Sequence, residues 1–325
     1  MTGLLDGIRQ NTFIIVGRAG IDLFTDAGVA AEDAETVSVG LGGSSANIGA
    51  GICKLGGKAA LVTRVSDDSV GSYCIGQLKK YGVDTRYVSP VGGEYRNSLA
   101  FYESRVEGHR NVIYRNGAAD FQMDMDDVAA VDYGAYGALI TAGTVFAAEP
   151  SRAATFDAFA RAKAAGLPII FDVDYRPYSW PSAAVAEDVL SRAAEVSDMI
   201  VGNDEEFGFM AGGIEKGLDK ARSLANTGKL VIYKMGEKGA ITFWEGAEIR
   251  TGIYPVEALK PTGAGDSFMA GLVTSIADGH SLREAILRGS ACASVTVSRP
   301  GCAPAMADKS TLDAFLARHP GPTAA

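Results

Sequence analysis

Short, mostly apolar segments alternate with longer amphipathic or alanine-rich stretches along most of the chain. Strands buried on both faces of a parallel sheet show such apolar runs, so we predict strands at Phe13–Val16, Leu61–Val65, Leu139–Thr141, Ile169–Val173, Met199–Val201 and Leu230–Tyr233. We predict helices at Ala46–Leu55, Val70–Tyr81, Arg152–Ala165, Ala183–Ala194, Leu218–Ala225, Ser267–Ala277, Leu282–Val297 and Leu312–Ala317. The alternation predicts an α/β fold with a mostly parallel central sheet and helices on both faces.

One region departs from this alternation. Ser98–Glu103 and Asn111–Arg115 are strand-like and are joined by the polar turn Ser104–Arg110, which favours a hairpin over a βαβ unit. Together with Ala19–Leu41 the hairpin could form a small sheet that covers the site and excludes water. We therefore expect a single domain over residues 1–325, with a β-sheet lid formed by approximately residues 18–41 and 94–117.

Composition narrows the class of protein. With 325 residues, 47% of them hydrophobic, the chain can bury a large core. A formal net charge of −9 without a basic cluster argues against nucleic acid or membrane as a partner. Met1–Asn11 has no apolar signal-like stretch, so we expect a cytoplasmic protein. The acidic run Asp120–Asp127 is most simply a solvated loop and helix start.

The cysteines and histidines give no sign of a metal or disulfide framework. Cys53, Cys74, Cys292 and Cys302 are far apart and form no Cys-x-x-Cys pair. The three histidines are isolated from one another among polar neighbours. We expect reduced thiols and surface histidines.

The segment Thr262–Gly271 joins a glycine turn to the start of an apolar helix. Glycines on either side of Ala264 allow consecutive backbone N–H groups to converge, and the helix N-terminus adds positive partial charge, so the turn favours an anion such as a phosphoryl group. Asp266 would then accept a proton from the hydroxyl that attacks phosphorus. Equally, Asp266 could be an ordinary helix N-cap in a tight loop. The turn alone leaves both interpretations open.

Other nucleotide and hydrolase motifs are missing or incomplete in the sequence. No Gly-x-x-x-x-Gly-Lys-Ser/Thr motif occurs, which argues against a P-loop enzyme. Gly40, Gly42 and Gly43 precede a helix, but Ser45 stands where a dinucleotide fingerprint needs its third glycine. No Gly-x-Ser-x-Gly elbow is present either. A nicotinamide-dependent oxidoreductase remains a distant alternative, which a test of NAD(P)H binding would exclude.

Gly42 and Gly43 open a helix with an exposed backbone, and Asn47 follows about one turn later. Glycines let a small ligand touch the main chain, and the Asn47 amide offers both a donor and an acceptor to sugar hydroxyls. Taken alone, Asn47 is explained more simply by ordinary capping or loop packing.

Four motifs occur in the order found in one family. Gly42-Gly43 with Asn47, Asn203-x-x-Glu206, Gly236-x-x-Gly239 and Gly263-Ala264-Gly265-Asp266 together make the chain similar to the ribokinase-like (PfkB) carbohydrate kinases from Val16 to about Leu316. The resemblance implies a ribokinase-like fold and phosphoryl transfer from ATP. It implies that Asp266 is the catalytic base and that the amides of Gly263, Ala264 and Gly265 form the anion hole.

The resemblance also implies roles for the nucleotide side of the site. Asn203 and Glu206 would organise Mg²⁺, with its waters, near the ATP phosphates. The segment from Lys234 through Gly236 to Gly239 would form a nucleotide-side turn, and small residues of the penultimate helix, including Ser290 and Ala293, would lie beside adenine. Asp22 resembles the family acid that binds substrate hydroxyls. Family members often pair through their lids, so a homodimer is expected.

Two arginines suggest a substrate that carries a carboxylate. Arg115 ends the predicted hairpin, and Arg176 follows a core strand at the edge of the sheet where α/β proteins bind ligands. A guanidinium matches a carboxylate with two donors, although each arginine could instead pair with a nearby aspartate.

A finer resemblance favours the sugar-acid kinases that act on the 6-hydroxyl of 5-dehydro-2-deoxygluconate in inositol catabolism. The segments that carry this resemblance are Val16–Leu23, Asp172–Pro177 and Ser298–Met306. Kinases of 2-keto-3-deoxygluconate and of fructose are the alternatives within the family. A sugar-acid sensor that no longer transfers phosphate is the alternative outside it.

Lys260-Pro261 departs from the family pattern. Many members have Asp-Thr at this point, and that acid often helps to hold a monovalent cation. We expect the Lys260 ammonium to remove or replace such a site, so that activity depends little on K⁺.

Overall fold

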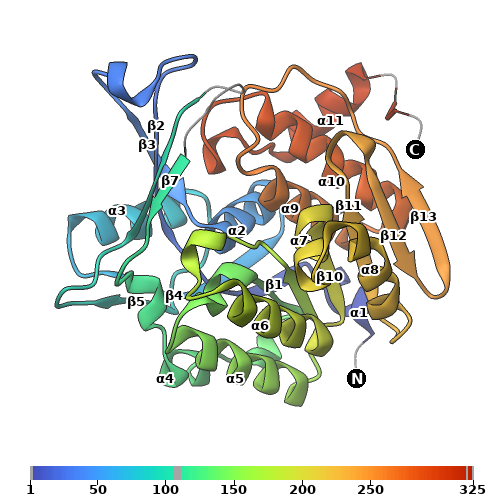
Figure 1. The fold of residues 1–325 in the computed structure, drawn as a ribbon, viewed down its shortest axis with the longest axis horizontal. Coiled ribbons are helices and arrows are strands. Elements are labelled where there is room, and N and C mark those ends of the chain that lie inside the picture. Colours follow the sequence, from blue (N-terminus) through green and yellow to red (C-terminus); the bar gives the residue numbers. More distant parts are fainter. Residues whose placement is uncertain (1–2, 105–110, 320, 324–325) are drawn as a thin grey trace.

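A nine-stranded sheet forms the centre of the computed structural model, which describes residues 3–104, 111–319 and 321–323 (Figure 1). Its strand order is β13-β12-β11-β10-β9-β8-β1-β4-β5, and all neighbours are parallel except the pairs that β12 forms with β11 and β13. The strands are β1 Thr12–Val16, β4 Lys58–Ser66, β5 Val88–Val91, β8 Ala138–Ala142, β9 Ile169–Asp172, β10 Met199–Asn203, β11 Leu230–Lys234, β12 Ala240–Trp244 and β13 Ala247–Thr251. All six predicted strands and the predicted α/β class are confirmed.

Helices cover both faces of this sheet, as predicted (Figure 1). Alternate residues of β1 show the division: Phe13 and Ile15 join one core cluster, whereas Ile14 and Val16 join the other. On the first face lie α1 Leu4–Arg9, α2 Ser44–Lys54, α3 Ser69–Lys80, α9 Ala264–Ala277, α10 Leu282–Val297 and α11 Lys309–Arg318. On the second lie α4 Met125–Ala129, α5 Ser151–Ala164, α6 Ala183–Val196, α7 Asp204–Met210 and α8 Gly217–Ala225.

A separate small sheet projects from one edge of the molecule, at the upper left of Figure 1. It has the order β3-β2-β6-β7 and consists of β2 Gly20–Phe24, β3 Ser38–Gly42, β6 Ser98–Tyr102 and β7 Asn111–Tyr114. β6 and β7 are antiparallel, which confirms the predicted hairpin, and β2 pairs with β6 in parallel. Most of the predicted turn Ser104–Arg110 lies outside the described residues.

The acidic run Asp120–Asp127 differs in part from its prediction. Asp124 caps α4 in a capping box with Asp127, as a helix start would require. Asp120, by contrast, is buried in the 3₁₀ helix η2, Ala119–Gln122, and forms an ion pair with Arg115. The prediction of a solvated loop is wrong at this residue, because a buried guanidinium five positions away needs the negative charge.

The cysteines are free thiols, of which Cys74, Cys292 and Cys302 are buried. Within residues 3–104, 111–319 and 321–323, the structure has no helix whose length and apolar character would suit it to cross a membrane.

Candidate active site

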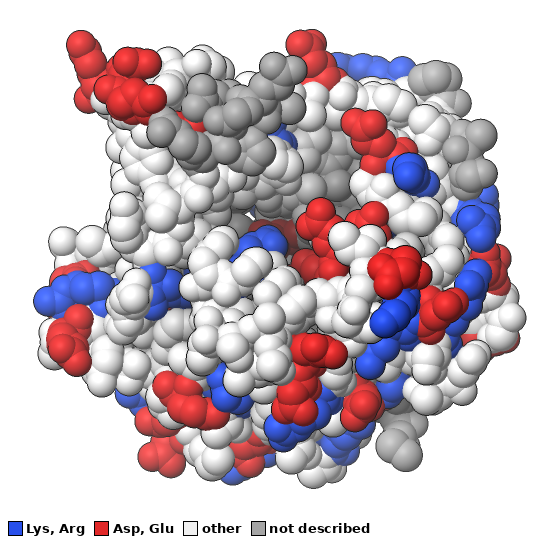
Figure 2. All heavy atoms as spheres, in the orientation of Figure 1, with Lys and Arg blue, Asp and Glu red and all other residues white. Residues whose placement is uncertain are grey.

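The predicted site residues converge on the carboxyl edge of the large sheet. β1 leads to Arg18, β9 ends at Asp172, β10 ends at Asn203 and β11 ends at Lys234. Parallel strands present these ends along one edge, where the α9 N-terminus also arrives. Figure 2 shows a hollow on this face beside the small sheet, with both acidic and basic side chains in it.

The glycine turn has the backbone conformation that an anion hole needs. Gly263 is left-handed, with φ of 81°, and α9 begins at Ala264, so the amides of the turn lie at a helix N-terminus. The N-cap of α9 is Gly263, and Asp266 lies inside the first turn of the helix. The alternative of an ordinary Asp N-cap is therefore wrong. The Asp266 carboxylate instead accepts a hydrogen bond of 3.0 Å from the Asn47 amide.

The environment of Asp266 suits a base that works near neutral pH. Burial and the neighbouring Asp174 carboxylate raise the pKa of Asp266 to about 6. The hydrogen bond from Asn47 and the charges of Arg176 and Lys234 oppose this rise. Asp266 is consequently ionised at neutral pH while keeping appreciable basicity.

Asp22, Gly42 and Gly43 meet where the small sheet joins the large one. A β-carbon on Gly42 would overlap the Asp22 carboxylate, and one on Gly43 would lie 2.5 Å from the Arg18 carbonyl oxygen. Only glycine permits these close approaches. Asp22 is buried, and within the described parts of the chain its Oδ1 has no hydrogen-bond partner. Burial raises the pKa of Asp22 to about 7, although Arg18 opposes the rise.

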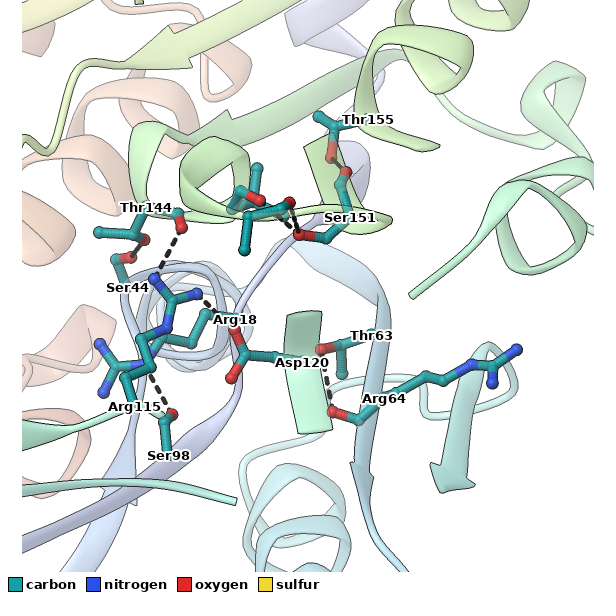
Figure 3. A network of polar contacts seen from close by, with 12 residues as sticks. Arg18, Ser44, Thr63, Arg64, Ser98, Arg115, Asp120, Thr144, Ser151 and Thr155 are labelled. Atoms are coloured by element: carbon teal, nitrogen blue, oxygen red, sulfur yellow. Dashed lines mark hydrogen bonds and ion pairs between the residues drawn. The ribbon is translucent and has the colours of Figure 1, made fainter. Parts of the chain in front are cut away.

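The two arginines predicted to bind a carboxylate both have internal partners. Arg115 pairs with Asp120, and its Nη1 donates to the Thr144 carbonyl oxygen at 2.7 Å (Figure 3). Arg176 pairs with Asp174 at 2.8 Å, and its side chain is 45% exposed. The structure thus brings both arginines to the site while pairing each with an aspartate, which was the alternative interpretation.

Asn203 and Glu206 form a capping box at the start of α7. The Asn203 side chain accepts from the Glu206 N–H, and Glu206 Oε2 accepts from the Asn203 N–H, both at 2.8 Å. Burial raises the pKa of Glu206, and burial together with Glu206 also raises that of Asp172 despite the nearby Lys234 ammonium. Carboxyl oxygens in this setting fit a hydrated divalent cation, whose charge would favour their ionised forms.

The remaining predicted nucleotide-side residues lie on two elements. Gly236 and Gly239 are both left-handed and bound the turn between β11 and β12, with φ of 56° and 82°. Ser290 and Ala293 lie on α10, which packs along α9. Lys234 lies closer to the catalytic turn, since its Nζ would be 3.6 Å from a β-carbon on Gly265.

Lys260 is buried directly before the glycine turn. Its ammonium donates to the Thr262 carbonyl oxygen at 2.6 Å and lies 3.5 Å from that of Thr296. Carbonyl oxygens are also the groups that bind a dehydrated monovalent cation.

Sequence reasoning assigned no role to three residues that reach the site. Arg18 follows β1, Asp172 ends β9, and the Cys302 thiol hydrogen-bonds to Asp22 and lies beside Gly263. The signal for Arg18 and Asp172 was present, because polar residues directly after buried strands lie at the ligand-binding edge of such sheets. Cys302 comes from a loop and carried no such signal.

Known proteins resemble this chain in sequence and in fold. Residues 12–309 match the model of the pfkB family of carbohydrate kinases. The 5-dehydro-2-deoxygluconokinase of Photobacterium profundum is 34% identical over 93% of this chain and 94% of its own, and that of Geobacillus kaustophilus is 32% identical over 96% of each. The fold also resembles a Vibrio cholerae fructokinase bound to fructose, ADP and calcium, at 23% identity and a TM-score of 0.82, over 95% of this chain and 99% of that one.

Proposed function

The chain belongs to the pfkB family of carbohydrate kinases, and from this we propose that it transfers the γ-phosphoryl group of ATP to the 6-hydroxyl of 5-dehydro-2-deoxy-D-gluconate. The observation that carries the reaction type is the Asp266 carboxylate beside a left-handed glycine turn at a helix N-terminus. The substrate assignment is supported by the names of relatives that match nearly the whole chain.

In the proposed reaction Asp266 removes the proton of the 6-hydroxyl as its oxygen attacks the γ-phosphorus. The new O–P bond forms while the bond from phosphorus to the β-bridging oxygen breaks, so that ADP leaves and Asp266 holds the proton. The amides of Gly263, Ala264 and Gly265 stabilise the charge on the equatorial phosphoryl oxygens. Asn47 orients the base through its hydrogen bond.

ATP and Mg²⁺ are the proposed cofactors. Asn203 and Glu206 would hold the metal through its waters, and Mg²⁺ would neutralise charge on the phosphates. Lys234, Gly236, Gly239, Ser290 and Ala293 would contact the nucleotide. Lys234 is supported most directly, because its ammonium lies next to the glycine turn.

On the acceptor side, Asp22, Gly42, Gly43 and Asn47 would bind the sugar hydroxyls, and Arg115 and Arg176 would supply positive charge for the acid. Both arginines retain nitrogen atoms beyond those used for their aspartate partners.

We also propose a cytoplasmic homodimer in which the small sheets of two copies pair. The large apolar side chains of this sheet support the pairing, since Val39, Val112 and Tyr114 are 50%, 42% and 62% exposed.

A coupled assay of ADP formation tests the proposed function. Mg-ATP is supplied with 5-dehydro-2-deoxygluconate, 2-keto-3-deoxygluconate or fructose, and we expect the highest kcat/KM for the first. Asp266→Asn should keep its fold and substrate affinity while kcat falls by about 10²-fold or more. ADP formation with none of the three compounds, together with tight binding of one, would favour a sensor instead.

A further inference from the structure

We propose that Arg18 is the primary anchor for the carboxylate of the acceptor, an inference that rests on the proposed sugar-acid function. Arg18 leaves the carboxyl end of β1 and is only 5% exposed. Its Nε donates to the Ser98 hydroxyl at 2.8 Å, which fixes the plane of the guanidinium against β6. Its Nη2 is buried and has no hydrogen-bond partner among the residues that the structure describes.

The charge of Arg18 distinguishes it from the other two arginines. Arg115 is neutralised by Asp120 and lies 3.9 Å over the Phe121 ring, and Arg176 is neutralised by Asp174. Over the described parts of the chain Arg18 forms no ion pair. A buried guanidinium without a counterion is costly, so a ligand that brings negative charge would be bound strongly.

Burial lowers the pKa of Arg18, but Tyr102 and the carboxyl groups of Asp120, Asp22 and Asp174 outweigh this, so that the pKa is raised. In the part of the chain that the structure describes, none of these carboxyl groups forms an ion pair with Arg18, and Asp174 is already paired with Arg176. Asp22 is close enough to Arg18 for each to influence the other, but no ion pair joins them. Burial raises the pKa of Asp22 to about 7, so that near neutral pH a large fraction of this group is protonated. Asp120 is already engaged by Arg115 (Figure 3). The terminal nitrogens of Arg18 carry no contact in this view, whereas those of Arg115 carry two.

Arg18 and Asp266 both lie near Asp22, since the Arg18 guanidinium and the Asp266 carboxylate each shift the pKa of Asp22. In the proposed binding mode the acceptor places its hydroxyl at Asp266 and its carboxylate at Arg18, with Asp22 near both. The close packing of Gly43 on the Arg18 carbonyl holds this loop against the start of α2.

Calorimetric binding of two probes tests the assignment without requiring turnover. The probes are 5-dehydro-2-deoxygluconate and its carboxamide, which differ only in the charged group. In Arg18→Gln we expect the affinity for the acid to fall by about 10- to 100-fold, as for other hydrogen bonds between charged groups, while the affinity for the amide changes little. Arg64→Gln removes the same charge from a guanidinium paired with Asp124 and Asp127 and should change neither affinity.

Equal weakening of both probes would overturn the inference, because it would mean that Arg18 only supports the fold. Unchanged binding of the acid would overturn it as well. If Arg18→Gln fails to fold, the affinities for the acid and for the amide are measured with Arg18→Lys and Ser98→Ala instead. These two variants alter the donor geometry while retaining the positive charge. Wild-type protein that binds the acid in an Arg18-dependent way but forms no ADP would contradict the proposed kinase function and leave this inference standing.

Discussion

Asp266 has to be ionised before it can accept a proton from the substrate. Its pKa of about 6 predicts that kcat/KM falls as the pH drops below about 6, because the protonated carboxyl is not a base. Asn47 stabilises the ionised form through its hydrogen bond, so Asn47→Ala should move this acidic limb to higher pH. Rates measured from pH 5 to 8 on both proteins test this. An acidic limb at the same pH in both would contradict it.

Lys260 places an ammonium among carbonyl oxygens next to the catalytic turn. We therefore expect the wild-type kcat to be the same in K⁺ and in tetramethylammonium, a cation too large for such a site. Lys260→Gln should lose activity, and K⁺ should restore part of it. Strong activation of the wild-type protein by K⁺ would show that a cation binds elsewhere.

Individual roles were harder to predict than positions. The order of the motifs was enough to predict that Asp266, Asn47 and Asp22 belong to the site. The hydrogen bond between Asn47 and Asp266, however, joins residues that are 219 positions apart. No local pattern contains such a contact. The sequence already allowed Arg115 and Arg176 to pair with nearby aspartates. Only the packing of the folded chain shows that both arginines do so, and that Arg18 has no ion-pair partner over the described parts of the chain.

At the scale of elements, the capping box of α7 stabilises the start of this helix, and its two residues are also the proposed ligands of the Mg²⁺ waters. Asn203→Ala removes the acceptor for the Glu206 N–H and should lower the free energy of unfolding by about 1 kcal/mol. Asn203→Ser keeps a good cap and should stay near wild type in stability. If the amide also orients Mg²⁺ waters, both variants should need more Mg²⁺ for half-maximal activity.

Chemical unfolding and Mg²⁺ titration measure these two effects separately. Ser281→Ala is a matched control, because Ser281 and Glu284 form the same kind of box at the start of α10. It should lose similar stability without changing the Mg²⁺ requirement. An unaltered Mg²⁺ requirement in both Asn203 variants would limit Asn203 to capping.

The sequence predicted six strands of the central sheet and the long helices well, because apolar runs and helical periodicity are local. It missed the antiparallel pair β12 and β13 at the sheet edge, although Glu245-Gly246 is a turn signal between two short strands. β13 is largely polar and exposed, so it lacks the apolar run that marked the other strands.

For the whole molecule, two buried acids link stability to pH. The pKa values of Asp22 and Asp266 are about 7 and about 6 in the folded chain, against about 4 for an aspartate in an unfolded chain. Between about pH 4 and 7 the folded state therefore binds more protons than the unfolded state. Their contribution to stability therefore decreases as the pH rises from about 4 to 7. Asp22→Asn, which cannot ionise, should lose less thermal stability than wild type between pH 6 and 8.

Thermal unfolding of the ligand-free protein at several pH values measures this difference. Asp219→Asn alters an exposed acid, with a side chain 82% exposed, and should follow the wild-type curve. A steeper pH dependence in Asp22→Asn than in wild type would reverse the assigned sign.

The small sheet leaves much of its surface open to solvent. Three residues of β7 and the first two of β3 are exposed, whereas every residue of β8 and all but the first of β1 are buried. A segment opens locally at low cost where few buried apolar contacts are lost. The amides of β7 and β3 should therefore exchange with deuterium sooner than those of β1 and β8, so that the face holding the acceptor opens locally while the catalytic edge stays folded.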